Sequence, residues 1–159
     1  MDIVVDTNIV FSAVLGGRIS RVFARAIIQF RLHTVKALIE EIQRHKTKIA
    51  RYSTLTPETL ETLIHHILTE DLKIHSTEKI PSDTKEKAKK LAKTADPSDW
   101  PFVALAIHLG APLWTGDKQL IRLALRTGVF RAVDTHGVEM MLEGKPWSEV
   151  EEEMRKRYL

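Results

Sequence analysis

Short apolar runs rich in β-branched residues alternate with amphipathic segments along this chain, and this alternation restricts the fold more than any other feature. Residues 3–5 are apolar without a break, which is typical of a strand buried on both faces of a parallel sheet. Further strand candidates are residues 33–35, 72–75, 112–115 and 129–133. Strands that alternate with helices predict an α/β fold: a three-layer α/β/α sandwich with a central, mainly parallel sheet and right-handed crossovers.

Helices fill the intervals between these runs. Apolar residues at helical spacing and helix start signals predict helices over residues 21–30, 36–52, 57–68, 84–94, 100–110, 118–126, 138–142 and 148–157. The length of 159 residues and the hydrophobic content of 43% suit one core. We therefore predict one domain over residues 1–159, with a C-terminal helical tail from about residue 146.

The composition excludes several kinds of chemistry. The chain has no cysteine, so disulfides, thiolate nucleophiles and sulfur-bound metals are ruled out, and a metal would bind to oxygen or imidazole. The 24 Lys and Arg residues against 21 Asp and Glu residues leave a formal charge of +3, which permits a polyanionic partner. No segment resembles a signal peptide or a membrane span, so we expect a soluble cytoplasmic protein with no membrane association.

Two predicted strands end in an acid that precedes a helical stretch. Asp6 follows residues 3–5, and Asp117 follows residues 112–115. Because the carboxyl ends of parallel strands form the ligand crevice of such a sheet, we expect both side chains to point into one cleft. Asp99 begins the helix that leads to the second strand. Helix capping explains each acid alone, but Ser, Thr or Asn would cap as well, and together the three Asp residues suit a hard cation.

A fourth acid lies inside a predicted helix, where no cap is needed. Relative to the apolar stripe that contains Leu38 and Ile42, Glu41 falls at the edge of the core and Glu40 faces solvent. Periodicity alone favours an ordinary amphipathic position for Glu41. That position would also let its carboxylate reach over the end of the sheet.

These four segments together resemble the PIN domain, a nuclease fold that includes the toxins of many toxin–antitoxin pairs. The segments are V-D-T-N at Asp6, L-I-E-E-I at Glu41, D-P-S-D-W-P-F-V-A-L-A at Asp99 and W-T-G-D-K-Q-L at Asp117. The resemblance covers residues 3–132 and implies a metal-dependent endoribonuclease whose four acids bind Mg²⁺ or Mn²⁺. As a hypothesis, the first three acids hold one ion and Asp117 helps to hold a second.

The resemblance also assigns supporting residues. Asn8 and Thr115 take the polar positions beside the acids. RNA would need basic surface around the acidic site, and we predict contacts from Arg44, Lys46, Lys85 and Lys89. The implied protein partners are an antitoxin and a second copy of the chain in a homodimer.

Two of the ligand assignments have alternatives. Glu40 adjoins Glu41, and we prefer Glu41 for its helical face. Asp96 precedes Asp99 by three residues, and we prefer Asp99 for its place before W-P-F-V-A-L-A. Asp134, at the end of the last predicted strand, is not carried over as a ligand.

Other functions fit the residues less well. An RNA-processing PIN nuclease without an antitoxin, or a non-catalytic PIN-like scaffold for RNA or protein, would share the motifs, although the intact quartet argues against a scaffold. A phosphohydrolase of the haloacid-dehalogenase type also begins with a strand that ends in Asp. That family requires a second Asp two positions on, where this chain has Asn8.

Overall fold

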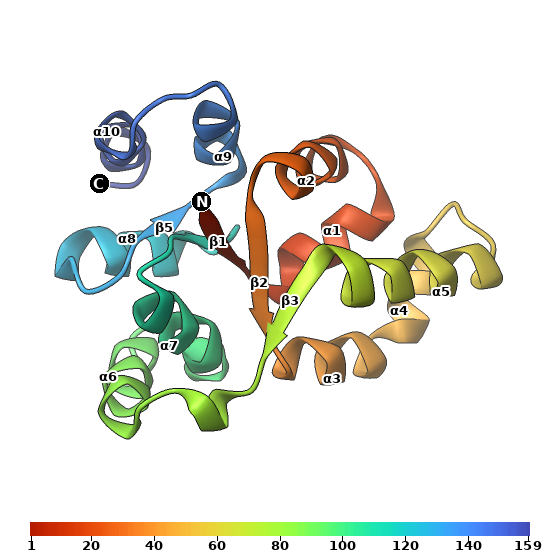
Figure 1. Cartoon of the computed structure of the whole chain (residues 1–159), viewed down its shortest axis with the longest axis horizontal. Coiled ribbons are helices and arrows are strands. Elements are labelled where there is room, and N and C mark those ends of the chain that lie inside the picture. The colour runs from red at the N-terminus through yellow and green to blue at the C-terminus, as the bar shows by residue number, and fades with distance from the viewer.

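Five parallel strands form one sheet in the computed structural model, which describes residues 1–159 (Figure 1). The strands are β1 (Asp2–Val5), β2 (Arg31–Val35), β3 (Leu72–His75), β4 (Leu113–Trp114) and β5 (Ala132–Val133), in the spatial order β3-β2-β1-β4-β5. Every pairing between neighbours is parallel. The predicted α/β fold with a central parallel sheet is confirmed.

Helices cover both faces of the sheet because the chain adds strands first toward one edge and then toward the other. The steps from β1 to β2 and from β2 to β3 run toward one edge, through α1 (Thr7–Leu15), α2 (Arg18–Gln29), α3 (Ala37–Arg44), α4 (Lys46–Tyr52) and α5 (Pro57–His66). The steps to β4 and β5 run toward the other edge, through α6 (Ser82–Ala92), α7 (Trp100–Leu109) and α8 (Lys118–Thr127). The two groups lie on opposite sides of the sheet (Figure 1), which is where crossovers of one hand place helices when the chain moves toward opposite edges.

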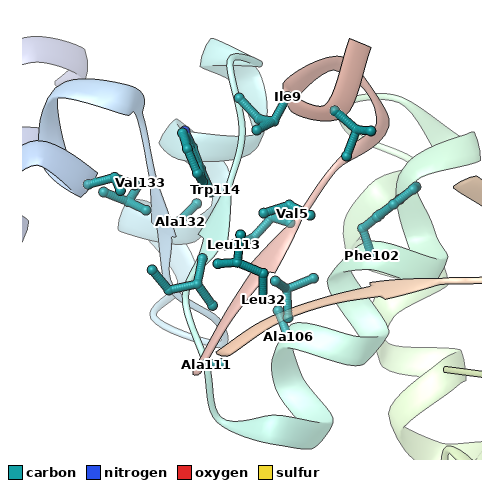
Figure 2. Close-up of a cluster of buried hydrophobic side chains, with 14 of the residues drawn as sticks. Val5, Ile9, Leu32, Phe102, Ala106, Ala111, Leu113, Trp114, Ala132 and Val133 are labelled. Carbon is teal, nitrogen blue, oxygen red and sulfur yellow. The ribbon is translucent and has the colours of Figure 1, made fainter. Parts of the chain in front are cut away.

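The core fills the space between the sheet and these helices. Trp114 on β4 is fully buried, and its indole Nε1–H donates a hydrogen bond of 3.1 Å to Thr135 Oγ1. Figure 2 shows apolar side chains of the central strands gathered with Phe102 and Ala106 of α7. Burial of each large side chain contributes roughly 1.5–3 kcal/mol. This packing holds the carboxyl ends of the strands, and the residues that follow them, in place.

One predicted helix is in fact two. The expectation of a continuous helix over residues 36–52 is wrong at His45, whose φ of −104° and ψ of 12° are not helical. Helix α3 buries Leu38 and Ile42, while α4 buries Ile49 and packs beside α1. The apolar spacing runs through the break, so the spacing alone does not reveal it.

Other elements differ from the prediction mainly in their bounds. Helix α1, which is not among the predicted helices, is separated from β1 by one residue. Strands β4 and β5 have two residues each, shorter than the predicted 112–115 and 129–133. A π-helical turn (Ile67–Asp71) continues α5, and 3₁₀ turns at Thr77–Lys79 and Pro97–Asp99 precede α6 and α7.

Two helices, α9 (Thr135–Leu142) and α10 (Trp147–Tyr158), end the chain. Val150 and Met154 of α10 are fully buried, so this helix packs on the domain. None of the helices has the length and the apolar character that crossing a membrane requires.

Candidate active site

A small polar cleft opens beyond the carboxyl ends of β1 and β4. The connections that leave these adjacent strands run toward opposite edges of the sheet, and ligand crevices form at such a reversal. The cleft has a volume of about 190 Å³, and no hydrophobic residue lines it. The lining residues are Asp6, Thr7, Asn8, Glu41, Asp96, Ser98, Asp99 and Asp117. All four acids of the proposed ligand set are therefore in this one cleft.

Asp6 is the most buried acid of the cleft, with 5% of its surface exposed. It caps helix α1, because its Oδ1 accepts a hydrogen bond of 3.0 Å from the backbone N–H of Ile9. Its Oδ2 accepts a hydrogen bond from the hydroxyl of Thr115. Both carboxylate oxygens are thus held, and the side chain has one fixed orientation.

Thr115 connects Asp6 to a second acid of the cleft. Its buried Oγ1 donates to Asp6 and accepts a hydrogen bond of 3.0 Å from the backbone N–H of Asp117. Asp117 caps helix α8, since its Oδ1 accepts hydrogen bonds from the N–H groups of Gln119 and Leu120 at 2.8 and 3.3 Å. Capping and a place in the cleft are therefore compatible for both Asp6 and Asp117.

Asp96 and Asp99, just before α7, have different hydrogen bonds. The side chain of Asp99 makes no capping hydrogen bond, so helix capping does not explain this residue. The capping carboxylate is Asp96, whose Oδ1 accepts hydrogen bonds of 3.0 and 2.7 Å from the backbone N–H and the hydroxyl of Ser98. The half-buried carboxylate of Asp99 has no protein donor and remains available to a ligand.

Helix α3 brings Glu41 to the cleft and leaves Glu40 outside it. The buried side chains of Leu38 and Ile42 face the core, Glu41 is half-buried at the edge of the cleft, and Glu40 is exposed. Asn8 lines the same cleft from the first turn of α1 and is exposed. The side of the helix predicted from periodicity is the side that the structure shows.

Thr7 also lines the cleft, although it is not among the predicted site residues. Its Oγ1 is buried without a hydrogen-bond partner. An unpaired buried hydroxyl costs about 1–3 kcal/mol, and a ligand in the cleft that bonds to this oxygen would recover part of that cost. The available signal was its position between Asp6 and Asn8 in V-D-T-N.

Burial and crowding of negative charge raise the pKa values of two of the acids. Burial raises the pKa of Asp6 from 3.8 to about 6, the hydrogen bond from Thr115 opposes the shift, and the charges of Asp117 and Glu41 add to it. Burial also raises the pKa of Asp99 to about 7, and the charges of the other cleft acids reinforce the shift. The acids repel one another, so a cation in the cleft would stabilise their ionised forms.

Comparison with known proteins agrees with this architecture. A family model of the PIN domain matches residues 4–152 of the chain. The chain belongs to the PIN domain family. A chain from the crystal structure of VapBC2 from Rickettsia felis, bound to a DNA fragment from their promoter, matches it with a TM-score of 0.63 at 14% identity. The match covers 84% of this chain and 98% of that chain and shows a shared fold, while no curated protein matches the sequence.

The donor set of this PIN domain suits Mg²⁺ or Mn²⁺. PIN domains are generally metal-dependent, and hard divalent cations prefer the carboxylate, hydroxyl and amide oxygens that line the cleft. No three Asp, Glu or His side chains already converge closely enough to hold an ion. Binding therefore requires at least one carboxylate to turn inward. Asp99 is the freest to do so, because it has no hydrogen-bond partner to give up.

One basic residue of α6, Lys89, packs on the segment that carries a cleft acid. The Nζ of Lys89 is 4.8 Å from the ring centroid of Trp100, the residue after Asp99, and 3.5 Å from a carboxylate oxygen of Glu86. Lys85, one turn earlier on α6, is half-buried. Of the two, Lys89 is therefore tied to the segment that carries a cleft acid.

The basic residues at the end of α3 and the start of α4 are oriented differently. Lys46 pairs with Glu61 of α5 and lines a separate groove between α3 and α5. Arg44 is exposed in the last turn of α3. Lys46 thus lies away from the acidic cleft, and its charge is partly balanced by Glu61.

Asp134 follows β5 as Asp6 follows β1, but its side chain contacts residues of the C-terminal helix α10. Its Oδ1 accepts a hydrogen bond of 2.8 Å from the N–H of Gly137, and its Oδ2 accepts one of 2.6 Å from the hydroxyl of Tyr158 and lies 3.2 Å from Arg157 Nε. Asp134 does not line the cleft. Its hydrogen bonds fasten α10 to the end of the sheet.

The Thr115→Val substitution is expected to destabilise the metal-free protein by about 1–3 kcal/mol, because Asp6 loses a donor and the N–H of Asp117 loses an acceptor. Thr115→Ser keeps the hydroxyl and is expected to cost less than Thr115→Val. Urea unfolding in EDTA measures both variants. A valine variant as stable as the serine variant would show that the hydroxyl contributes nothing to stability.

Proposed function

We propose that this PIN domain is an endoribonuclease that hydrolyses phosphodiester bonds of single-stranded or structured RNA with Mg²⁺ or Mn²⁺. The observation that carries the proposal is that five carboxylates, the four proposed ligands and Asp96, line one small cleft that has no apolar residue. No Lys or Arg lines the cleft to balance them. Acids with raised pKa values and no counter-charge are typical of a functional site.

In this proposal the four acids divide the metal binding among them. Asp6, Glu41 and Asp99 hold one ion, and Asp117 helps to hold a second. Divalent ions in such a site supply an activated water, polarise the scissile phosphate and neutralise charge on the leaving oxygen. Asp6 provides a ligand of fixed orientation, and the side chain of Asp99 turns toward the ion.

Two polar residues support the acids. Thr115 keeps Asp6 oriented through its hydroxyl, and Asn8 offers an amide N–H to a phosphate oxygen at the edge of the cleft. The predicted contacts to the RNA backbone remain Arg44, Lys46, Lys85 and Lys89. Of these, Lys89 is packed on the residue next to Asp99 and is expected to contribute most.

The test is incubation of 5′-labelled RNA with the protein and either Mg²⁺ or Mn²⁺, with EDTA as the control. Both a single strand and a hairpin are used, together with DNA of the same sequence. We expect RNA fragments with 5′-phosphate and 3′-hydroxyl ends, and none in EDTA. Cleavage that persists in EDTA, or fragments that end in a cyclic phosphate, would contradict the metal-dependent mechanism.

We further propose that the chain is the toxin of a toxin–antitoxin pair, acts as a homodimer and is held inactive by a protein antitoxin. The support is the family and the shared fold with a chain of a VapBC toxin–antitoxin complex. Induced expression in a bacterial host is expected to arrest growth with the wild type but not with Asp99→Asn. An unchanged growth rate with active wild-type protein would favour an RNA-processing nuclease without an antitoxin.

A further inference from the structure

A second, smaller hollow lies directly beside the acidic cleft, between helices α1 and α4. Asn8, Phe11 and Leu15 line it from α1, and His45, Lys48 and Tyr52 line it from α4 and the residue before it. We call it the α1–α4 groove. Asn8 lines both the groove and the acidic cleft, so the two spaces adjoin at this residue.

The side chains of the α1–α4 groove present aromatic surface to solvent. Tyr52 ends α4 and is 63% exposed, although a tyrosine ring normally gains free energy from burial. The Phe11 and His45 rings pack edge to face with their centroids 5.8 Å apart. Exposed rings around a shallow hollow are a platform on which a flat, unpaired base can stack.

The charge of the α1–α4 groove is also suited to a nucleotide. Lys48 is exposed, makes no ion pair and is the only Lys, Arg, Asp or Glu residue that lines the groove. A lysine beside aromatic rings provides a counter-charge for a backbone phosphate. The charged residues that line the neighbouring cleft are all acidic. An uncharged base is not repelled by these carboxylates, whereas a phosphate needs a cation there.

We propose that the α1–α4 groove binds one unpaired nucleotide of the RNA substrate next to the scissile phosphate, with its base on Tyr52 and its phosphate near Lys48. The volume of about 180 Å³ is below the roughly 300 Å³ at which pockets hold drug-sized ligands, so it has room for one base. A base within a duplex is paired and stacked and cannot enter. The inference rests on the proposed ribonuclease function and selects single-stranded RNA as its substrate.

The experiment uses single-stranded RNA that carries 2-aminopurine beside the mapped cleavage site. Its fluorescence and anisotropy are measured with Asp99→Asn protein in Mn²⁺, which is expected to bind RNA without cutting it. We expect stacking to quench the probe. Addition of Tyr52→Ala is expected to abolish the quenching and to weaken binding roughly tenfold, as loss of one stacked base does. Tyr52→Phe keeps the ring and is expected to retain both signals.

Two matched controls accompany these variants. Ile28→Ala truncates another apolar side chain, 83% exposed on α2, and is expected to change neither signal. In the otherwise wild-type enzyme, Tyr52→Ala is expected to raise KM while kcat stays nearly the same, because the ring binds the substrate but does not touch the reacting atoms.

Three results would overturn the inference: quenching that survives Tyr52→Ala, loss of quenching in Tyr52→Phe, or equal binding of the same RNA after annealing to its complement. None of these results affects the ribonuclease proposal, which fails if the wild type cuts no RNA with either metal. In that case the 2-aminopurine is placed at successive internal positions of the same single strand, and the binding measurement still decides the role of the groove because binding does not require cleavage.

Discussion

Replacing Asp99 with Asn is expected to reduce the rate of RNA cleavage at least a hundredfold while leaving the fold intact. The neutral amide binds a divalent cation far more weakly than a carboxylate, and metal stabilisation of the transition state is worth several kcal/mol, with about 1.36 kcal/mol for each factor of ten. Because the side chain of Asp99 caps no helix and makes no hydrogen bond, the loss reports on chemistry rather than folding. Initial rates with saturating Mn²⁺ measure the effect.

The matched control is Asp96→Asn, three residues earlier. Asp96 caps the 3₁₀ turn through Ser98, and an asparagine oxygen accepts the same hydrogen bonds. We expect this variant to lose less than about tenfold in rate, since it removes one charge that lines the cleft but no proposed ligand. If Asp96→Asn is the inactive variant and Asp99→Asn cleaves normally, the ligand assignment must be reversed.

Replacing Asp6 with Asn is expected to raise the free energy of unfolding of the metal-free protein at about pH 8 by about 3 kcal/mol. Burial raises the pKa of Asp6 from 3.8 to about 6, so folding favours its protonated form. The stabilisation from that proton is complete below about pH 4 and is lost as the pH rises through about 6. Above that range the wild type keeps a buried, ionised acid, whereas Asn has no charge and can still cap α1.

Calorimetry or urea unfolding in EDTA from about pH 5 to 8 measures this effect, with Asp83→Asn on the exposed first turn of α6 as the control. The stability of the wild type is expected to fall across this range, and that of Asp6→Asn to fall less. Asp2 and Glu61 have lowered pKa values, so their contributions are lost only at lower pH. A less stable Asp6→Asn protein at the upper pH would contradict the assigned cost of the buried charge.

Added Mn²⁺ or Mg²⁺ is expected to reverse the order of these two proteins. An ion that binds only the folded state raises the free energy of unfolding by about 4.1 kcal/mol at a concentration about one thousand times its Kd, which exceeds the difference of about 3 kcal/mol between the two proteins. The wild type should gain this stabilisation and Asp6→Asn should not, because Asp6 is the fixed ligand of the cleft. Equal thermal shifts in the two proteins would place the ion elsewhere.

Local sequence patterns predicted most of the secondary structure but not its interruptions. The apolar run at residues 3–5 became β1 because an unbroken apolar strand is stable only when both faces are buried. The predicted helix over residues 36–52 breaks at His45, and neither Pro nor Gly marks the position. The break is seen only in the tertiary structure, where α3 and α4 both pack beside α1, a segment far from them in the chain.

The candidate site divides in the same way. Periodicity selected Glu41 over Glu40, because the side of a helix that faces the core follows from the spacing of its apolar residues. From the sequence, either Asp96 or Asp99 could cap the turn. Only the hydrogen bonds in the structure show that Asp96 is the cap and that Asp99 is free. The unpaired hydroxyl of Thr7 also has no counterpart in a sequence pattern.

The sequence by itself determined the order of the elements, the parallel sheet and the family, because strand and helix periodicity and four short motifs are local properties. Only the tertiary structure decided which side chains meet: Thr115 with Asp6, Asp134 with Tyr158, and Tyr52 beside the acidic cleft through Asn8. These contacts depend on distances between segments far apart in the chain. Such distances are set by how the helices pack on the sheet, and the spacing of residues along one element does not contain them.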